Sequence, residues 1–295
     1  MKVSIATGSI ASIPLITQLL AGNQLDQVFI SEPHKEQLSI FGQIVKPESI
    51  VKTTEIDAKN LEVSTDCQVL ISAGYPYKIN LLENGVEALN IHFGPLPESR
   101  GPDPLFWTLK QGKKIAYVSI HKISENFDQG ELLLQKGHVI MPGENYGLLY
   151  SRLGSLLVPM VLEILSSDFK GTPQDSDNGM YYSKPTETDL RIDWNLDATK
   201  IVNLVNACNP RYHGAATTMN GTMVRVFEAN PIPDNFIPNT RQLKPGQVVY
   251  AGQEGVFVKC GNDSILNLNI VSLNEGFFSG AKLAAMGVNQ SITFI

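Results

Sequence analysis

The sequence predicts an α/β domain built on a parallel sheet, followed by a smaller domain of short strands. In the first half of the 295 residues, short runs rich in β-branched residues alternate with helical runs, as in βαβ units. Residues 167–187 are rich in Ser, Asp, Gly, Pro and Thr and show little apolar periodicity. Beyond them, one helical stretch precedes several short β-rich runs, which is typical of a small β-barrel. We therefore expect a first domain at 1–170, a linker at 171–188 and a second domain at 189–295.

The first domain is expected to begin with a strand that turns into a helix at Thr7-Gly8-Ser9. Ser12 can cap this helix, and Pro14 is tolerated in its first turn. The most continuous apolar strand is Cys67–Ser72, which Ala73-Gly74-Tyr75-Pro76 closes. The strands are predicted at Val3–Ala6, Gln27–Ile30, weakly near Glu48–Lys52, Cys67–Ser72, Ala88–His92 and Tyr117–Ile123, and the helices at Ser12–Leu20, Pro104–Lys110 and Gly147–Ser166.

The second domain is expected to begin with a helix at Thr199–Cys208. Short runs rich in β-branched residues follow it, each bounded by turn residues. These strands are predicted at Ala215–Met219, Met223–Glu228, Gly246–Val249, Gly255–Cys260 and Ile265–Val271.

The composition is that of a protein with a sizeable core and no strongly charged surface. Hydrophobic residues make up 43% of the chain, and 23 Lys and Arg stand against 29 Asp and Glu, a net charge of −6. No block of like charge predicts a nucleic-acid tail or a membrane patch. Cys67, Cys208 and Cys260 are far apart, which favours reduced thiols. Without a signal-peptide shape or an 18-residue apolar span, we expect a cytoplasmic protein with no membrane contact.

Two polar side chains, Asn90 and His92, end the predicted strand Ala88–His92. Residues two apart in a strand point to the same side, and the carboxyl ends of strands border the ligand crevice of open α/β sheets. An Asn amide can stabilise an oxyanion, and a neutral His can accept or donate a proton near pH 7. The alternative is that Asn90 caps a turn and His92 is a buried core histidine.

Asp128 lies in a polar loop after the predicted strand Tyr117–Ile123. A carboxylate there can orient His92 and stabilise its charged form, although Asp-x-Gly is also a common turn. His121 either lines the same cavity or packs in the core. Tyr75 and Tyr77 are either walls for a planar ligand or ordinary loop residues.

Several familiar catalytic motifs do not occur in the chain. It has no Walker-type Gly-Lys-Ser/Thr and no Gly-x-Gly-x-x-Gly after the first strand, so phosphate-loop and dinucleotide chemistry lack support. Gly-x-Ser-x-Gly, His-Glu-x-x-His and paired Cys-x-x-Cys are absent as well.

The order and spacing of these polar motifs resemble those of a known family. The chain is similar over nearly its whole length to the two-domain formyltransferases that use 10-formyltetrahydrofolate, which include methionyl-tRNA formyltransferase and the sugar-nucleotide N-formyltransferases. The matching motifs are Asn90-x-His92, the turn through Pro97, Arg100-Gly101, Asp128-x-Gly130, Arg191-Ile192-Asp193-Trp194 and Asn209-Pro210.

The resemblance implies a fold, a reaction and a set of roles. The N-terminal domain would be Rossmann-like and hold the folate, and the smaller C-terminal domain would be an OB-like β-barrel. Asn90 would polarise the formyl oxygen, His92 would transfer protons, and Asp128 would orient His92 and stabilise its charge. 10-Formyltetrahydrofolate would be the formyl donor, and no metal is implied. Folate contacts would come from Gly74, Tyr75, Gly94, Pro95, Leu96, Pro97, Glu125, Asn126 and Phe127.

One departure from the family lies in the turn after His92. The family commonly has Ser-Leu-Leu-Pro there, whereas this chain has Gly94-Pro95-Leu96-Pro97. The change removes a hydroxyl and stiffens the backbone, so it bears on folate or acceptor binding. The three predicted catalytic residues are intact, which favours an active enzyme. The departure is the one feature in favour of a different class, a folate-binding or regulatory protein without transferase activity.

Charge favours a small amine as the formyl acceptor. The tRNA-specific members of the family carry a basic insertion after the second strand, but residues 31–37 (Ser-Glu-Pro-His-Lys-Glu-Gln) are short and have no Lys/Arg cluster. Residues 1–170 hold 14 Lys and Arg against 18 Asp and Glu, and the remainder holds 9 against 11. Proteins that grip several phosphates normally show a basic face. We favour a nucleotide-linked amino sugar over Met-tRNA; an amino acid or a carrier-bound amine also fits, and the oligomeric state stays open.

Overall fold

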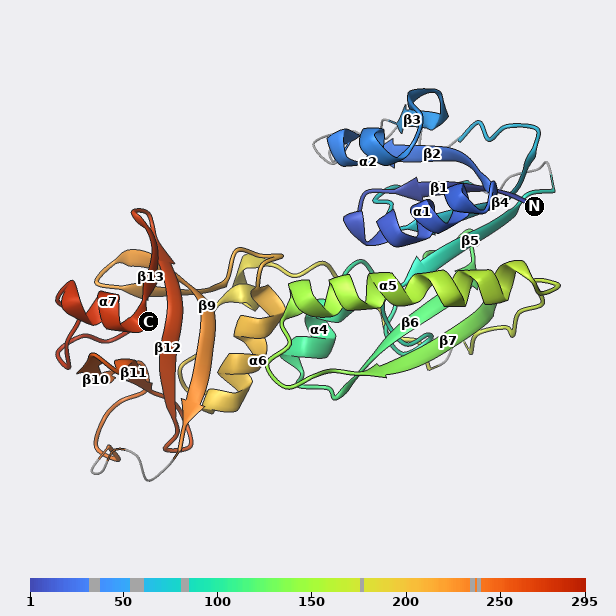
Figure 1. Cartoon of the computed structure of the whole chain (residues 1–295). Helices are drawn as coiled ribbons and strands as arrows, with labels where there is room; N and C mark the ends of the chain where they lie inside the picture. Colours follow the sequence, from blue (N-terminus) through green and yellow to red (C-terminus); the bar gives the residue numbers. More distant parts are fainter. Residues whose placement is uncertain (32–37, 54–60, 81–84, 176–177, 234–236, 238–239) are drawn as a thin grey trace. The chain divides into compact units, whose positions relative to one another are not determined.

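A seven-stranded sheet forms the centre of the first part of the computed structural model, with strand order β3-β2-β1-β4-β5-β6-β7 (Figure 1). The structure describes residues 1–31, 38–53, 61–80, 85–175, 178–233, 237 and 240–295. The strands are β1 (Lys2–Thr7), β2 (Leu25–Ser31), β3 (Ile50–Thr53), β4 (Cys67–Ala73), β5 (Glu87–His92), β6 (Ile115–Lys122) and β7 (Leu132–Val139).

The chain divides into two units that interleave along the sequence. The first unit holds residues 1–104, 115–139 and 150–183, and the second holds 105–114, 140–149 and 184–295. Part of the predicted linker therefore belongs to the first unit: Thr172 pairs with Leu132, and Tyr181 pairs with Arg100. The boundaries proposed from the sequence, at 170 and 188, stay a prediction.

The sheet is mixed, whereas the βαβ pattern predicted a parallel one. Strands β1 to β5 are parallel to one another in the order 3-2-1-4-5, but β6 runs antiparallel to β5, and β7 antiparallel to β6. The nine residues from 123 to 131 return the chain directly from β6 to its neighbour, and a parallel pair would need a longer crossover. The Rossmann-like α/β class is confirmed, with an antiparallel extension.

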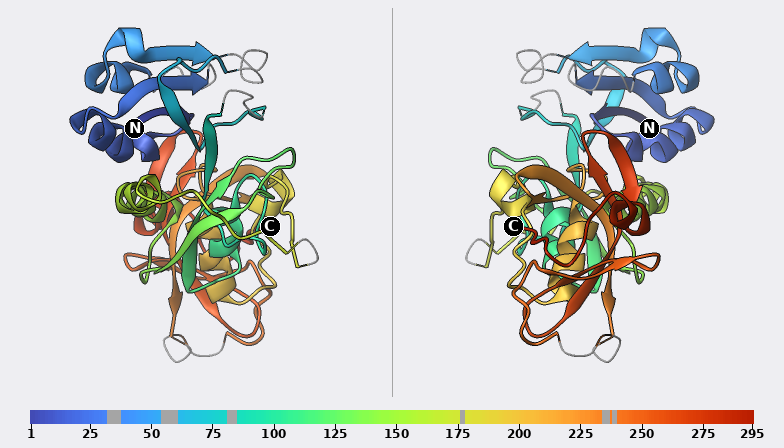
Figure 2. Two further views of the ribbon diagram at one scale, coloured as in Figure 1. Left: turned by 90° about the vertical axis from the view of Figure 1, so that its right-hand side faces the viewer. Right: turned by 90° about the vertical axis from the view of Figure 1, so that its left-hand side faces the viewer.

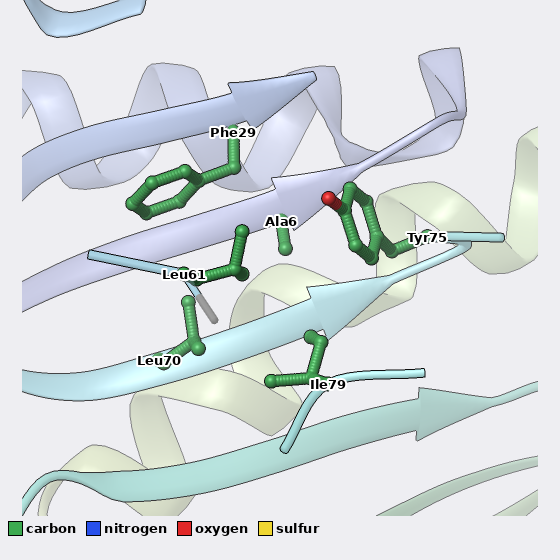
Figure 3. Packing of buried hydrophobic residues seen from close by; sticks show 6 residues of the cluster. All are labelled: Ala6, Phe29, Leu61, Leu70, Tyr75 and Ile79. Carbon is green, nitrogen blue, oxygen red and sulfur yellow. The ribbon is translucent and has the colours of Figure 1, made fainter. Parts of the chain in front are cut away.

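Apolar side chains from neighbouring strands and the following loops bury one face of this sheet (Figure 3). Strand β1 lies in the middle of the sheet, and Val3, Ile5 and Ala6 are fully buried. Each large aliphatic side chain removed from water contributes about 1.5–3 kcal/mol. The cluster drawn in Figure 3 consists of Ala6, Phe29, Leu61, Leu70, Tyr75 and Ile79.

Helices of the first unit follow the predicted pattern, with one difference in capping. Helix α1 (Ile13–Ala21) has Pro14 in its first turn and lies against the β2 part of the sheet (Figure 1, Figure 2). Ser12 makes no side-chain cap bond; instead Ser9 accepts from the Ala11 amide and caps a preceding 3-10 turn (Ile10–Ser12). The shorter elements are α2 (Leu38–Ile44) and a 3-10 turn at Pro47–Ser49.

Helix α5 (Tyr146–Leu165) corrects the expectation that the chain has no 18-residue apolar span. It is the one helix among the described residues that is long and apolar enough to cross a membrane, with a mean hydropathy of 1.6. Leu153, Leu157 and Val161 are nevertheless buried in the fold, and Gly154 lies against Ala11 so closely that a Cβ would sit 3.0 Å from its carbonyl oxygen. Buried side chains along one face are what a core helix requires.

The second unit is an antiparallel sheet whose edges are joined by the final residues. Its order is β10-β11-β12-β9-β8, and β13 pairs with β12. The segment 292–295 hydrogen-bonds to Thr218 of β8 and to Val248 of β10, so backbone pairing runs around a closed barrel. The elements are α4 (Pro104–Lys110), a 3-10 turn (Glu187–Leu190), α6 (Ala198–Cys208), β8 (Ala215–Met219), β9 (Thr222–Ile232), β10 (Val248–Gly252), β11 (Gly255–Lys259), β12 (Ile265–Leu273), β13 (Gly276–Ser279) and α7 (Gly280–Ala285).

Candidate active site

The carboxyl ends of β1, β4 and β5 meet at one edge of the first unit's sheet. Thr7 pairs with Ala73, and Ser72 pairs with Asn90, so the three parallel strands end at the same level. The Thr7 hydroxyl donates to the Ala73 carbonyl at 2.8 Å and ties two of these ends together. The segments that follow β4 and β5 therefore leave the sheet side by side, at the edge where open α/β sheets bind ligands.

Asn90, His92 and Asp128 lie together at this edge. Asn90 Nδ2 donates to Asp128 Oδ1 at 3.4 Å, and His92 Nδ1 lies 3.5 Å from the same oxygen. His92 is 5% exposed and Asp128 is 9% exposed. Asn90 and His92 are two apart in β5, so the same pleat directs both side chains toward Asp128.

The loop that carries Asp128 is held in an unusual backbone conformation. Asp128 has φ of 57°, the left-handed region that Asp tolerates better than most residues. Gly130 follows so close to Lys122 that a Cβ would sit 1.8 Å from its carbonyl oxygen, so only glycine fits. The Gly101 amide then donates to Asp128 Oδ2 at 2.9 Å. The loop is thereby folded back from the end of β6 over β5.

Burial and charge act in opposite directions on His92. Removal from water lowers the pKa of His92 below its ordinary value, while nearby Asp128 and the Ser99 carbonyl work against that shift. His92 Nε2 lies 2.6 Å from the Ser99 oxygen and Nδ1 faces Asp128, so each ring nitrogen faces an acceptor. His92 is therefore neutral at neutral pH. When the ring takes up a second proton, Asp128 and the Ser99 carbonyl can accept hydrogen bonds from its two N–H groups.

Asp128 remains ionised despite its burial. Burial alone would raise its pKa, but hydrogen bonding with His121, the attraction of His92 in its protonated form and the Gly101 amide together outweigh this effect, and the pKa of Asp128 is lowered. An ionised carboxylate beside a neutral imidazole is the arrangement that stabilises a transient imidazolium.

His121, which the sequence left as either a cavity or a core residue, is buried and lies beside Asn90 and Asp128. It is the cross-strand partner of Asn90 in the β5–β6 pair, and its Nε2 lies 3.1 Å from Asn90 Nδ2 and 3.4 Å from Asp128 Oδ1. Its Nδ1 lies 2.8 Å from the Lys122 carbonyl, which can only accept, so Nδ1 carries the proton.

The turn after β5 is fixed by contacts that explain Gly94. A Cβ at Gly94 would lie 2.6 Å from Pro104 Cβ and 2.9 Å from His92 Nε2, so the serine common in the family has no room there. The Gly94 carbonyl accepts from Ser119 Oγ at 2.6 Å, and the Leu96 amide donates to Gln135 Oε1 at 2.7 Å. The peptide bond between Leu96 and Pro97 is cis.

The other predicted folate contacts differ in accessibility. Gly74 is exposed with φ of 70°, directly after β4. The Tyr75 ring is a member of the core cluster of Figure 3, and its hydroxyl bonds to Thr53 Oγ1 at 2.5 Å. Glu125, Asn126 and Phe127 are exposed in the loop before Asp128, and Phe127 is 55% exposed. Folate contact at these positions and at Gly94–Pro97 stays a prediction.

Gln174 is one of the residues of this neighbourhood that sequence reasoning missed. Its Nε2 donates to the backbone carbonyls of Asp128 at 2.9 Å and Gly130 at 2.7 Å. It falls in a polar stretch without periodicity, and no local pattern reveals a partner 46 residues away. Among the residues that the structure describes, no group of three or more His, Cys, Asp or Glu side chains could hold a metal ion.

The arrangement combines an amide donor with a buried acid–base pair. Asn90 is partly exposed, its Nδ2 donates to Asp128 Oδ1, and His92 lies beside the same carboxylate. Such a set can stabilise an oxyanion and move a proton without a nucleophilic side chain.

Comparison with known proteins points in one direction. Residues 34–163 match the family described as formyl transferase, and residues 184–284 match the formyl transferase C-terminal domain. A methionyl-tRNA formyltransferase of Nitrosomonas eutropha is 32% identical over 192 residues, which are 64% of this chain and 58% of that protein. That alignment therefore spans less than two thirds of the relative.

Two solved structures share the fold. HypX from Aquifex aeolicus in complex with tetrahydrofolic acid aligns with a TM-score of 0.69 and 23% identity, over 98% of this chain and 48% of that chain. An N-formyltransferase from Helicobacter canadensis, in complex with folinic acid and dTDP-3-aminofucose, aligns with a TM-score of 0.62 and 14% identity, over 91% of this chain and 98% of that one.

Proposed function

Because this chain belongs to the formyl transferase family and contains both of its domains, we propose that it transfers the formyl group of 10-formyltetrahydrofolate to a primary amine of a small molecule. The observation that carries the proposal is the meeting of Asn90, His92 and Asp128 at the carboxyl end of β5. Formyl transfer needs an oxyanion donor and a proton relay but no nucleophilic side chain, and these three residues supply both.

The first step is attack of the neutral amine on the formyl carbon. The carbon–oxygen π electrons move to the formyl oxygen, which becomes an oxyanion in the tetrahedral intermediate. In this proposal, Asn90 Nδ2 keeps one hydrogen on Asp128 Oδ1 and donates the other to the oxyanion. The bond between the formyl carbon and N10 of the folate then breaks, which releases tetrahydrofolate and the N-formyl product.

His92 carries the proton that the attacking amine loses. Neutral His92 accepts it, and Asp128 and the Ser99 carbonyl stabilise the imidazolium. The proton then passes to N10 as the folate leaves, so His92 returns to its neutral form and charge balances over the cycle. The lowered pKa of His92 favours both proton transfers. It keeps the ring neutral before the amine attacks, and it makes the imidazolium a stronger acid that gives its proton to N10.

A small amine, of which a nucleotide-linked amino sugar is the first choice, agrees with the charge of the chain. The net charge is −6, and neither part of the sequence is basic. A relative with the same fold is named for a complex with an amino-sugar nucleotide. The stretch at residues 31–37, where the tRNA-specific members are basic, has no Lys/Arg cluster in the sequence; residues 32–37 lie outside the described part of the structure.

Methionyl-tRNA is the second candidate, and sequence identity favours it. The Nitrosomonas eutropha relative, at 32% identity, is named for that activity. A tRNA acceptor predicts strong salt dependence, because each released counterion weakens binding as salt rises.

One assay separates the two acceptors. The protein is incubated with 10-formyltetrahydrofolate and either a panel of amino-sugar nucleotides, amino acids and carrier-bound amines or methionyl initiator tRNA, and tetrahydrofolate release and product mass are followed. We expect transfer to a small amine with a rate that changes little with salt. Salt-sensitive formylation of the tRNA alone would replace the small amine as acceptor.

Two further outcomes would count against transfer itself. Release of formate at the same rate with and without any amine would indicate hydrolysis of the donor. Tight folate binding with no turnover on any amine would indicate the folate-binding or regulatory class.

A further inference from the structure

The segment from Gly171 to Tyr182, of which 176–177 lie outside the described residues, runs along the two loops that build the candidate site. Thr172 exchanges backbone hydrogen bonds with Leu132 at 2.8 and 2.9 Å, directly after the Asp128 loop. Ten residues later, Tyr182 donates to the Arg100 carbonyl at 2.9 Å, and Met180 accepts from the Arg100 amide at 2.9 Å. The segment is thus anchored at both loops, and Gln174 lies between the anchors.

We propose that Gln174 is a positioning residue: it locks the Asp128 loop to the Arg100–Gly101 turn and so fixes the carboxylate of Asp128 against His92 and Asn90. The role in catalysis rests on the proposed function, because it acts through the Asp128–His92 pair. The geometric part does not depend on that function and has its own test below.

On one side, the Gln174 amide holds the backbone of the Asp128 loop. Nε2 uses both of its hydrogens, one for the Asp128 carbonyl at 2.9 Å and one for the Gly130 carbonyl at 2.7 Å. These two carbonyls bracket a loop whose residue Asp128 is in the left-handed region, a conformation that the surroundings must hold.

On the other side, the Gln174 carbonyl oxygen holds Arg100. Arg100 Nε and Nη2 donate to Gln174 Oε1 at 3.3 and 3.0 Å, and Arg100 is 6% exposed. A Cβ on Gly179 would lie 2.1 Å from Arg100 Nη1, so the guanidinium rests directly on that backbone. Arg100 therefore has little freedom to move away from Gln174.

These contacts close a ring around Asp128. Arg100 is followed by Gly101, whose amide donates to Asp128 Oδ2 at 2.9 Å. Gly101 has φ of 109°, and a Cβ there would lie 2.0 Å from the Tyr182 carbonyl oxygen. The Arg100–Gly101 turn therefore packs directly against the segment from Gly171 to Tyr182. Gln174 holds the Asp128 backbone, and Gly101 holds its carboxylate. Both the side chain and the main chain of Asp128 are thus held by connected contacts of Gln174, Arg100 and Gly101.

Only a side-chain amide of this length can make both sets of bonds. A glutamate would still accept from Arg100, but it would turn a negative oxygen toward the Asp128 and Gly130 carbonyls, which it cannot donate to. An alanine would remove the hydrogen bonds that Gln174 makes to the Asp128 and Gly130 carbonyls and to the buried Arg100 guanidinium. Gln174→Glu therefore separates the loop contact from the arginine contact, and Gln174→Ala removes both.

The kinetic test is a double-mutant cycle with Asp128→Asn. We expect Gln174→Ala and Gln174→Glu each to lower kcat by about 10- to 100-fold, with KM for the folate donor little changed, because a misplacement near 1 Å has that effect. In the Asp128→Asn background, the same changes should lower kcat by no more than about threefold, since the residue through which they act is already altered. Equal fold-losses in both backgrounds would overturn the positioning role.

The second test needs no activity, so it separates failure of this inference from failure of the proposed function. Hydrogen exchange of the Gly101 amide reports on its bond to Asp128 Oδ2. We expect exchange to become about tenfold faster or more in both Gln174 variants, with the β5 amides of Ile91 and Leu89 unchanged. Gln290→Ala, which removes a comparable bond from a glutamine Nε2 to the Val249 carbonyl in the second unit, is the matched control and should leave Gly101 unaffected. Wild-type protection of Gly101 in both Gln174 variants would contradict the proposal.

Discussion

Asp128 is the residue at which the polar groups of the site converge. Its Oδ1 lies within 3.5 Å of Asn90, His92 and His121, and its Oδ2 accepts from the Gly101 amide. One ionised carboxylate therefore orients both the Asn90 amide, which we propose stabilises the oxyanion, and the His92 imidazole, which we propose moves the proton. This shared contact explains why removing one member should affect the others.

The acid–base pair predicts how activity depends on pH. Burial lowers the pKa of His92, so the ring is neutral above a value that lies below its usual ~6.5. Activity that needs neutral His92 is complete at neutral pH and is lost as pH falls through that lowered pKa. The pKa of Asp128 is lowered too, so it adds no change near neutrality. A kcat/KM profile measured between about pH 5 and 8 checks this; an acidic limb centred above ~6.5 would contradict it.

At the level of residues, the sequence predicted what is local and missed what is distant. Asn90 and His92 are two apart on one strand, so their shared face could be inferred from spacing, whereas the contact of Asp128 with His92 was expected from the family resemblance and not from spacing. The role of His121 depends on the register between β5 and β6, which no single stretch of sequence specifies. Gln174 reaches Asp128 over 46 residues, and its surroundings in the sequence look like a linker.

Among the elements, the turn after β5 is packed so closely at Gly94 that one added methyl group should lower both stability and activity. We expect Gly94→Ala to lower the free energy of unfolding by about 1–3 kcal/mol and to reduce activity, because its Cβ meets Pro104 and His92 Nε2. Gly42→Ala in α2 is the control, since nothing lies within 4 Å of the added Cβ. Alanine there should be neutral or stabilise by about 0.5–1 kcal/mol. Thermal unfolding of the two variants tests both, and an undisturbed Gly94→Ala protein would refute the packing described.

Elements with strong periodicity or clear boundaries were predictable. Helix α4 spans Pro104–Lys110 as predicted, β1 is one residue longer than predicted at each end, and β4 and β5 are one residue longer at one end. Strand β7 (Leu132–Val139) was not predicted: three leucines precede Gln, Lys, Gly and His, so neither alternation nor a continuous apolar run marks it. Its pairing with β6 stabilises it instead.

At the scale of the molecule, the α/β part and the antiparallel barrel were expected from composition and pattern. The interleaving of the units was not, because residues 105–114 and 140–149 join the second unit through tertiary contacts rather than through a change in composition. The mixed sheet was missed for a similar reason: strand direction depends on how a connection folds, which the pattern of apolar residues does not record.

The buried thiols give a prediction for the whole fold. Cys67, Cys208 and Cys260 are free and buried, and burial raises the pKa of each, to about 12 for Cys208 and Cys260. A reagent that reacts with thiolates should therefore modify the native protein slowly. After unfolding, it should modify all three thiols rapidly. Rapid reaction of any one of them in the native protein would show that part of the core opens readily.

The central claim is that Asn90 and His92 perform formyl transfer from 10-formyltetrahydrofolate. The most direct measurement compares tetrahydrofolate release, with the best amine acceptor found, by the wild-type protein and by Asn90→Ala and His92→Ala variants whose folding is checked by thermal unfolding. We predict that folded Asn90→Ala loses about 10²- to 10³-fold in kcat, as for the loss of one oxyanion donor, and that His92→Ala loses about 10²- to 10⁴-fold. Near-wild-type turnover in both folded variants would contradict the account.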